Sequence, residues 1–151
     1  MKWLGIAVGS VLLLVVGYGL YMTQWANPRV VRELRDDPQG ELAGKVMLLT
    51  LPSGKAIPVN YLRDGDTVYA AADGRWWREL EGGGGRGSVL IRGETLTGHV
   101  RAERKDMDLR DSVFERLRPT APRVFGTMII IELDPEAAGG PRDPSAEGDA
   151  S

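Results

Sequence analysis

The chain has 151 residues, with 19 Lys and Arg against 21 Asp and Glu, a formal net charge of -2 and no cysteine. The length suits one compact domain with extensions. A charge so close to neutral argues against nucleic-acid binding, which needs a basic surface to displace counterions from phosphates. The lack of cysteine excludes disulfides, thiolate metal ligands and a thiol nucleophile.

The amino-terminal residues 3–22 contain no charged side chain. About 20 apolar residues in a helix span roughly 30 Å, the thickness of the hydrocarbon core of a bilayer. We therefore predict that residues 1–26 form a transmembrane helix that anchors the protein to membrane lipid. A cleaved signal peptide is the alternative, but the apolar run is longer than usual for one and lacks a small-residue cleavage site.

The positive charges that flank this segment predict its orientation. Lys2 stands alone before it, whereas Arg29, Arg32 and Arg35 follow it. Because Lys and Arg concentrate on the cytoplasmic side of a membrane helix, we expect a single-pass protein of the cell membrane whose main domain faces the cytoplasm. At the other end, residues 134–151 hold five acids, three prolines and no aromatic or branched aliphatic residue, which predicts a disordered acidic tail.

Between these ends, residues 27–133 are predicted to form one domain. Asn27 can cap a helix over 27–37, and a second helix is expected over 107–117. The apolar and alternating patterns predict strands at 46–51, 56–62, 67–72, 88–92, 94–103 and 126–133, with a hairpin at Asp64-Gly65 and a flexible loop over 81–87. The predicted fold is mainly β: a six-stranded antiparallel split β-barrel with flanking helices, preceded by the transmembrane helix, since closure hides strand edges.

Catalysis by side chains alone is not indicated. His99 is the only histidine, and the alternation of its strand places it on the polar face. Asp64 and Asp66 are explained by a turn, and Ser53 has no base near it in the sequence. We predict no catalytic residue and no metal site.

Two short stretches could bind a ligand. Ser53, Gly54 and Lys55 form a bend whose N–H groups, hydroxyl and ammonium could hold a phosphate, although by itself the pattern favours an ordinary strand-to-strand turn. The small residues 70–72 would let a flat ligand lie against the backbone, or would simply pack tightly in a small barrel.

Trp76 and Trp77 lie between Arg75 and Arg78. Two large rings supply contact area, and guanidinium groups supply charge-assisted hydrogen bonds to anionic oxygens. This pattern has three explanations: a ligand site, contact with membrane headgroups, or a plug in which Trp76 and Leu80 close the barrel.

Residues 46–103 resemble the deazaflavin-dependent nitroreductase and quinone reductase family, within the flavin-binding split β-barrel group. The family's elements occur in order, as Thr50, Ser53-Gly54, Pro58 with Tyr61, Asp64-Gly65, the small residues 70–72 and the Trp element 76–80. The resemblance implies a deazaflavin coenzyme or FMN that passes a hydride to a quinone or nitro compound. It also implies a ring on the small-residue strand and a phosphate near the bend. The implied cofactor-binding residues are Ser53, Gly54, Lys55, Pro58, Ala71, Ala72, Trp76, Trp77 and Arg78.

The chain departs from the family pattern at three places. Leu51 and Pro52 stand where the family has Gly-Arg, so a basic phosphate ligand is missing. The Gly-rich loop before the Trp element is shortened to Asp73-Gly74, and Glu79 stands where the family has Asn. The alternative function is therefore a cofactor-free, tethered β-barrel that serves as an interaction module at the membrane. A homodimer is an assembly that the sequence leaves open.

Overall fold

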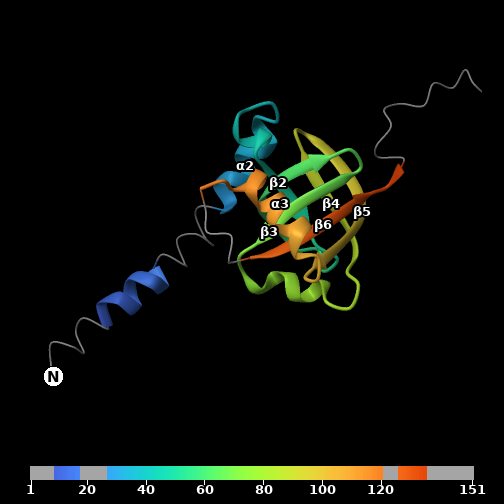
Figure 1. Cartoon of the computed structure of the whole chain (residues 1–151). Helices are drawn as coiled ribbons and strands as arrows, with labels where there is room; N and C mark the ends of the chain where they lie inside the picture. Colours follow the sequence, from blue (N-terminus) through green and yellow to red (C-terminus); the bar gives the residue numbers. More distant parts are fainter. Residues whose placement is uncertain (1–8, 18–26, 121–125, 136–151) are drawn as a thin grey trace, which may run out of the picture.

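The structure is a computed structural model, and it describes residues 9–17, 27–120 and 126–135. Six strands form a closed barrel in the order β1-β2-β3-β6-β5-β4, and every neighbouring pair is antiparallel (Figure 1). The strands are β1 Val46–Thr50, β2 Ala56–Asp64, β3 Thr67–Ala72, β4 Gly85–Ile91, β5 Glu94–Glu103 and β6 Thr127–Leu133. The predicted mainly-β, six-stranded antiparallel barrel with flanking helices is thus confirmed.

Alternation along the strands fills the barrel with apolar side chains. In β5, Leu96 and Val100 are buried in the core, while Thr95 and Thr97 are exposed. His99 points outward as predicted, and its Nε2 lies 2.7 Å from the carbonyl oxygen of Gly83. The histidine is therefore a hydrogen-bonded surface residue.

The predicted loop over 81–87 is wrong at its carboxyl end, because β4 begins at Gly85 rather than at Ser88. Gly85 pairs with Val100 and Arg86 with His99. Glycine carries no strand-forming side chain, so the local pattern gave no sign of a strand. The extension arises because the long strand β5 needs a partner for its backbone N–H and C=O groups.

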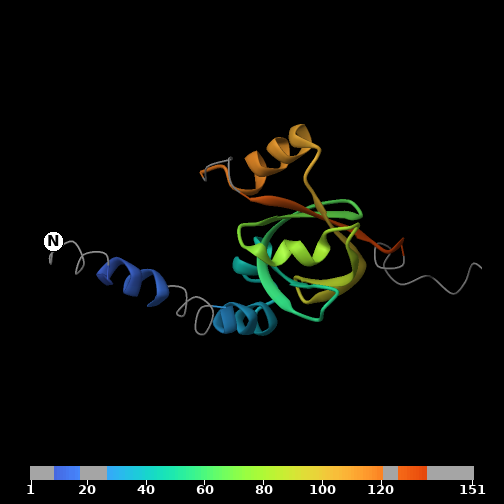
Figure 2. The ribbon, with the colours of Figure 1, turned by 90° about the horizontal axis from the view of Figure 1, so that it is seen from below.

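Two helices cover the outside of the barrel. Helix α2 (Asn27–Asp36) packs on β1 and β2 through Val30, Val31 and Leu34, beside the short 3-10 helix η2 (Leu42–Gly44). Helix α3 (Met107–Leu117) begins where the Asp106 carboxylate accepts the Leu109 N–H at 2.9 Å, and it buries Val113 and Phe114 against β2, β3 and β6. The two helices overlap in Figure 1, but the turned view of Figure 2 shows α2 and α3 at opposite margins of the barrel.

One end of the barrel is closed by the 3-10 helix η3 (Arg75–Leu80), which lies across the opening in Figure 2. Leu80 is only 1% exposed and belongs to the barrel core, and the half-buried Trp76 and Trp77 pack against that core. Of the three explanations for the tryptophan pair, the plug therefore describes what η3 does in the fold.

The predicted membrane segment lies mostly outside the described residues, of which only 9–17 belong to it, and these are helical. Among the described residues no helix has both the length and the apolar character needed to cross a membrane. Residues 136–151 of the predicted tail also lie outside the described part. Asp134, which the sequence analysis assigns to that tail, is bound to the barrel: its carboxylate accepts hydrogen bonds from Arg86 at 2.7 and 2.6 Å and from Thr97 at 2.8 Å.

Candidate functional site

A slot lies on the outer face of β2 and β3, between α2 and α3. Its floor consists of Pro58 and Asn60 from β2 and Ala71 from β3, whose side chains are too short to fill the space between the helices. The helices contribute Val30 from α2, Leu117 and Arg118 from the end of α3, and Trp76 from η3. The other lining residues are Val46, Ile57, Val59, Asp73 and Gly74, from β1, β2 and the turn that precedes η3. The cavity has a volume of about 330 Å³.

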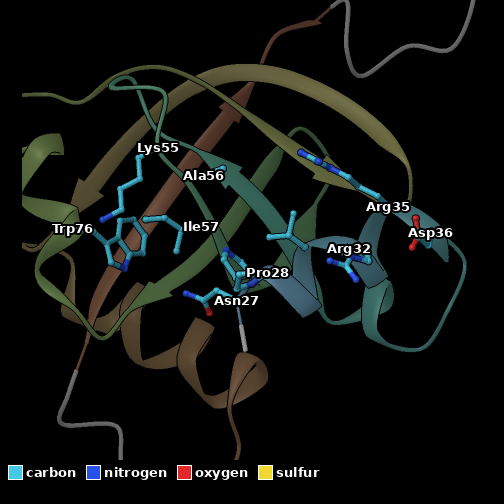
Figure 3. Close-up of a pocket in the computed structure, with 11 residues that line it drawn as sticks. Asn27, Pro28, Arg32, Arg35, Asp36, Lys55, Ala56, Ile57 and Trp76 are labelled. Atoms are coloured by element: carbon cyan, nitrogen blue, oxygen red, sulfur yellow. The ribbon is translucent and has the colours of Figure 1, made fainter. Parts of the chain in front are cut away.

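A larger groove adjoins the slot and runs along α2 (Figure 3). It has a volume of about 900 Å³ and shares Ile57, Pro58 and Trp76 with the slot. Its other lining residues are Asn27, Pro28, Val31, Arg32, Arg35 and Asp36 from α2, and Lys55 and Ala56 from the start of β2. A narrow slot with a floor of small side chains therefore meets a wider groove at one tryptophan.

The groove carries an excess of positive charge. Arg32, Arg35 and Lys55 are all exposed, and within the described part of the chain no ion pair engages any of them. Among the described residues that line the groove, Asp36 is the one acid. Three cations against one carboxylate favour an anionic ligand.

Trp76 forms the wall between the two cavities. The ring is half-buried against the barrel core, which holds it in place. The absence of a side chain at Gly74 leaves room for the Trp76 ring, because a Cβ at Gly74 would lie only 3.3 Å from Cδ1 of that ring. In Figure 3 the side chains of Lys55 and Ile57 extend toward the ring of Trp76. An aromatic face and an ammonium group are thus presented to the same space.

The bend at Ser53–Lys55 does not fit a phosphate, because its donors already have acceptors. The Gly54 N–H donates to the Leu51 carbonyl at 2.8 Å, and the Lys55 N–H donates to the Ser53 hydroxyl at 3.4 Å. The Ser53 N–H and hydroxyl donate to the two carboxylate oxygens of Glu79, at 3.3 and 3.1 Å. A carboxylate from η3 therefore stands where the resemblance would place the phosphate of a cofactor.

The predicted site residues separate into two groups. Lys55, Pro58 and Trp76 line the groove, and Pro58, Ala71 and Trp76 line the slot, so these four converge. Ser53, Gly54, Ala72, Trp77 and Arg78 line neither cavity. Ala72 is buried inside the barrel, and the ring of Trp77 is covered by Arg104, at 4.8 Å, with Arg78 at 6.0 Å.

The sequence analysis missed the contribution of α2. Arg32 and Arg35 lie on the polar face of this amphipathic helix, where sequence reasoning used them only for membrane orientation. The signal was present, since Val30, Val31 and Leu34 predict the face that packs on the barrel. Because those three residues contact the barrel, Arg32 and Arg35 must lie beside the contact between α2 and the barrel.

The class that the structure defines is one of fold: a closed six-stranded antiparallel barrel with helices on its outer face. A pyridoxamine 5'-phosphate oxidase-like protein from Listeria innocua is similar in structure, with a TM-score of 0.50 and 18% sequence identity over 60% of this chain and 84% of that one. At this identity the likeness concerns the fold alone.

Two further solved structures overlap less well. General stress protein 26 from Bacillus anthracis has a TM-score of 0.41 at 18% identity, over 68% of this chain and 88% of that chain. A protein assigned to 5-nitroimidazole antibiotic resistance from Bacteroides thetaiotaomicron has a TM-score of 0.42 at 13% identity, over 71% and 79%. The sequence matches no protein-family model and no curated protein.

Proposed function

We propose that the slot and the groove together bind a flat, anionic redox cofactor, FMN or a deazaflavin coenzyme, and that the protein is a reductase of quinone or nitro compounds. One observation carries the proposal: the slot over Ala71 and Pro58 adjoins, at Trp76, a groove with three cations that form no ion pair within residues 9–17, 27–120 and 126–135. A ring needs the first environment and a phosphate-bearing tail needs the second. When bound, such a cofactor supplies the hydride chemistry.

The size of the two cavities supports this assignment. Binding cavities for small molecules and cofactors commonly measure roughly 300–1,000 Å³ and combine an apolar lining with a few polar groups. The slot alone, at about 330 Å³, suits a ring system, and the groove, at about 900 Å³, leaves room for the tail. The quinone or nitro compound that accepts the hydride would have to approach the exposed edge of the cofactor ring.

The residues of the chain would have separate tasks. Pro58 and Ala71 keep the floor of the slot low, and Trp76 would provide an aromatic surface for the ring. Lys55, Arg32 and Arg35 would neutralise the charge of the tail, Arg with a planar fork of donors and Lys as a point charge. The walls from α2 and α3 would reduce the access of water to the ring, which would strengthen these electrostatic contacts.

We further propose that the amino-terminal segment anchors the protein in the membrane with the barrel toward the cytoplasm, where a lipid-soluble quinone would be within reach. The large apolar side chains at residues 11–16 are between 52% and 75% exposed, which supports a lipid partner for them. Fractionation tests this: the full chain should stay with carbonate-washed membranes, and a chain without residues 1–26 should be released. Recovery of the full chain in the soluble fraction would contradict the anchor.

The cofactor assignment is tested by titrating the full-length protein, in detergent, with FMN and with a deazaflavin coenzyme while tryptophan fluorescence is recorded. We expect micromolar affinity for at least one of them, and Lys55→Ala or Arg32→Ala should weaken it about 5- to 10-fold. Lys45→Ala is the control, because Lys45 pairs with Glu41 and lines neither cavity. Folded protein that binds neither compound would exclude the reductase.

The second candidate function is a cofactor-free barrel that serves as an interaction module at the membrane. The observation in its favour is that the Ser53 bend is already occupied by the Glu79 carboxylate. It predicts colourless, folded protein that binds neither compound, and a Trp76→Ala variant that changes stability or partner capture but no reduction rate. The same titration therefore separates the two candidates.

A further inference from the structure

The bend at Ser53–Lys55 has the form of an anion site. Gly54 has φ +87°, in the left-handed region that favours glycine, so the chain turns sharply after Ser53. Both groups donate to one carboxylate, at 3.3 and 3.1 Å, each to a different oxygen of Glu79. Two convergent donors on one oxyanion are what a bound phosphate would also require.

The carboxylate that sits there is held by the barrel. Glu79 belongs to η3 and is 26 positions away from Ser53 in the sequence. Its neighbour Leu80 is only 1% exposed and anchors η3 in the core. The contact thus joins a bend of the barrel wall to its end plug, and it depends on the tertiary fold rather than on local chain geometry.

Lys55 keeps its charge for other ligands. It lies two positions from Ser53, yet among the described residues no ion pair joins it to Glu79 or to any other acid. It lines the groove, as do Arg32 and Arg35. The donors of the bend are therefore occupied, whereas Lys55 beside it, and Arg32 and Arg35 farther along the groove, form no ion pair in the described part of the chain.

We propose that Glu79 is a specificity-determining residue, which acts as a built-in anion that excludes phosphate from the Ser53 bend and leaves the cations of the groove as the anion-binding groups. The exclusion of phosphate rests on the Ser53–Glu79 contact alone. The diversion of a cofactor's phosphate toward Arg32 and Arg35 rests, in addition, on the proposed function.

The first experiment uses inorganic phosphate as the probe and requires no cofactor. The thermal midpoint of the full-length protein in detergent is measured with increasing phosphate, against sodium chloride at equal ionic strength. We expect no response of the native protein and a rise of about 2–4 °C for Glu79→Ala at 100 mM phosphate, by mass action on the folded state. Adding Ser53→Ala to Glu79→Ala should abolish the rise.

Glu81→Ala is the matched control, because it removes the same charge from an exposed position two residues away. A phosphate response of Glu79→Ala that is no larger than that of Glu81→Ala would overturn the proposal. A phosphate response of the native protein as large as that of Glu79→Ala would also overturn it. A lower midpoint of Glu79→Ala without any phosphate response would make the contact a structural link only, and would also overturn it.

The second experiment compares FMN with riboflavin, which has the same ring and no phosphate. Glu79→Ala should raise the affinity for FMN about 10-fold and leave that for riboflavin unchanged, and Glu81→Ala should change neither. An equal effect on both compounds would contradict a role in phosphate exclusion. If the native protein binds no cofactor but Glu79→Ala responds to phosphate, the proposed reductase function is contradicted and the role of Glu79 stands. If the native protein binds a cofactor but Glu79→Ala does not respond to phosphate, the reductase function stands and the role of Glu79 is contradicted.

Discussion

The guanidinium of Arg118 donates to the carboxylate of Asp73 at 2.7 Å, and this ion pair fastens the end of α3 to the turn between β3 and η3. Arg118 also lies 4.5 Å from the centre of the Phe114 ring, and both members of the pair line the slot. Gly126 provides the space: it has φ +105°, and a Cβ there would collide with the guanidinium and lie 3.1 Å from the carboxylate. One wall of the slot thus depends on a residue without a side chain.

Gly126→Ala should therefore destabilise the protein by about 2–3 kcal/mol, because it adds a collision with the ion pair to the cost of a left-handed backbone. The free energy of unfolding in urea measures this. Gly82→Ala is the control: its φ is +82°, but a Cβ at Gly82 would meet no atom within 4 Å, so only the backbone cost applies. Equal losses for the two variants would show that the ion pair can move aside freely.

Leu80→Ala should cost about 2–5 kcal/mol of unfolding free energy, because it opens a cavity where η3 plugs the barrel. Leu80 is 1% exposed, whereas Trp77 is half-buried and covered by Arg104 on its outer side. We expect a smaller loss for Trp77→Phe, measured in the same urea titration. A loss below about 1 kcal/mol for Leu80→Ala would mean that η3 does not hold the end of the barrel closed.

Ala71→Leu should fill the slot and weaken the binding of FMN or deazaflavin at least 10-fold, because the side chain of Ala71 forms part of its floor. The fold should persist, since the added atoms enter a cavity rather than the packed barrel interior. Cofactor titration and thermal unfolding are measured together. Thr95→Leu, at an exposed strand position outside both cavities, is the control. Unchanged affinity in Ala71→Leu would place the ring elsewhere.

Acid should destabilise the barrel through Glu103. The Lys105 N–H, the Arg101 side chain and the Asp106 N–H all donate to its carboxylate and lower its pKa from 4.5 to about 2. Because the folded-state pKa is the lower one, the ionised form stabilises the fold above the unfolded pKa, and this contribution disappears as the pH falls from about 5 to 2.

Glu103→Gln should consequently be less stable than the native protein near pH 7 and should lose less stability between pH 5 and pH 2. Urea unfolding at a series of pH values measures the difference. Glu94→Gln, at the exposed first residue of β5, is the matched control and should follow the native curve. Parallel curves for Glu103→Gln and the native protein would show that the bonds to this carboxylate do not contribute.

The strands could largely be predicted because their signals are local. The apolar run at Met47 to Leu49, the Asp64-Gly65 turn and the alternation of β5 each lie within a few residues, and each matches the observed element. The start of β4 could not be predicted, because Gly85 and Gly87 carry no local signal for a strand. These glycines belong to β4 only because β5 pairs with them.

The candidate site divides in the same way. Residue type pointed to Lys55, Ala71 and Trp76 as ligand-binding residues and the family resemblance added Pro58, and these four converge on two adjoining cavities. The pairing of Ser53 with Glu79, the burial of Ala72 inside the barrel and the entry of α2 into the groove were decided by tertiary structure. Strand pattern and turn chemistry act between near neighbours in the chain, whereas barrel closure decides which distant side chains meet and which donors are already occupied.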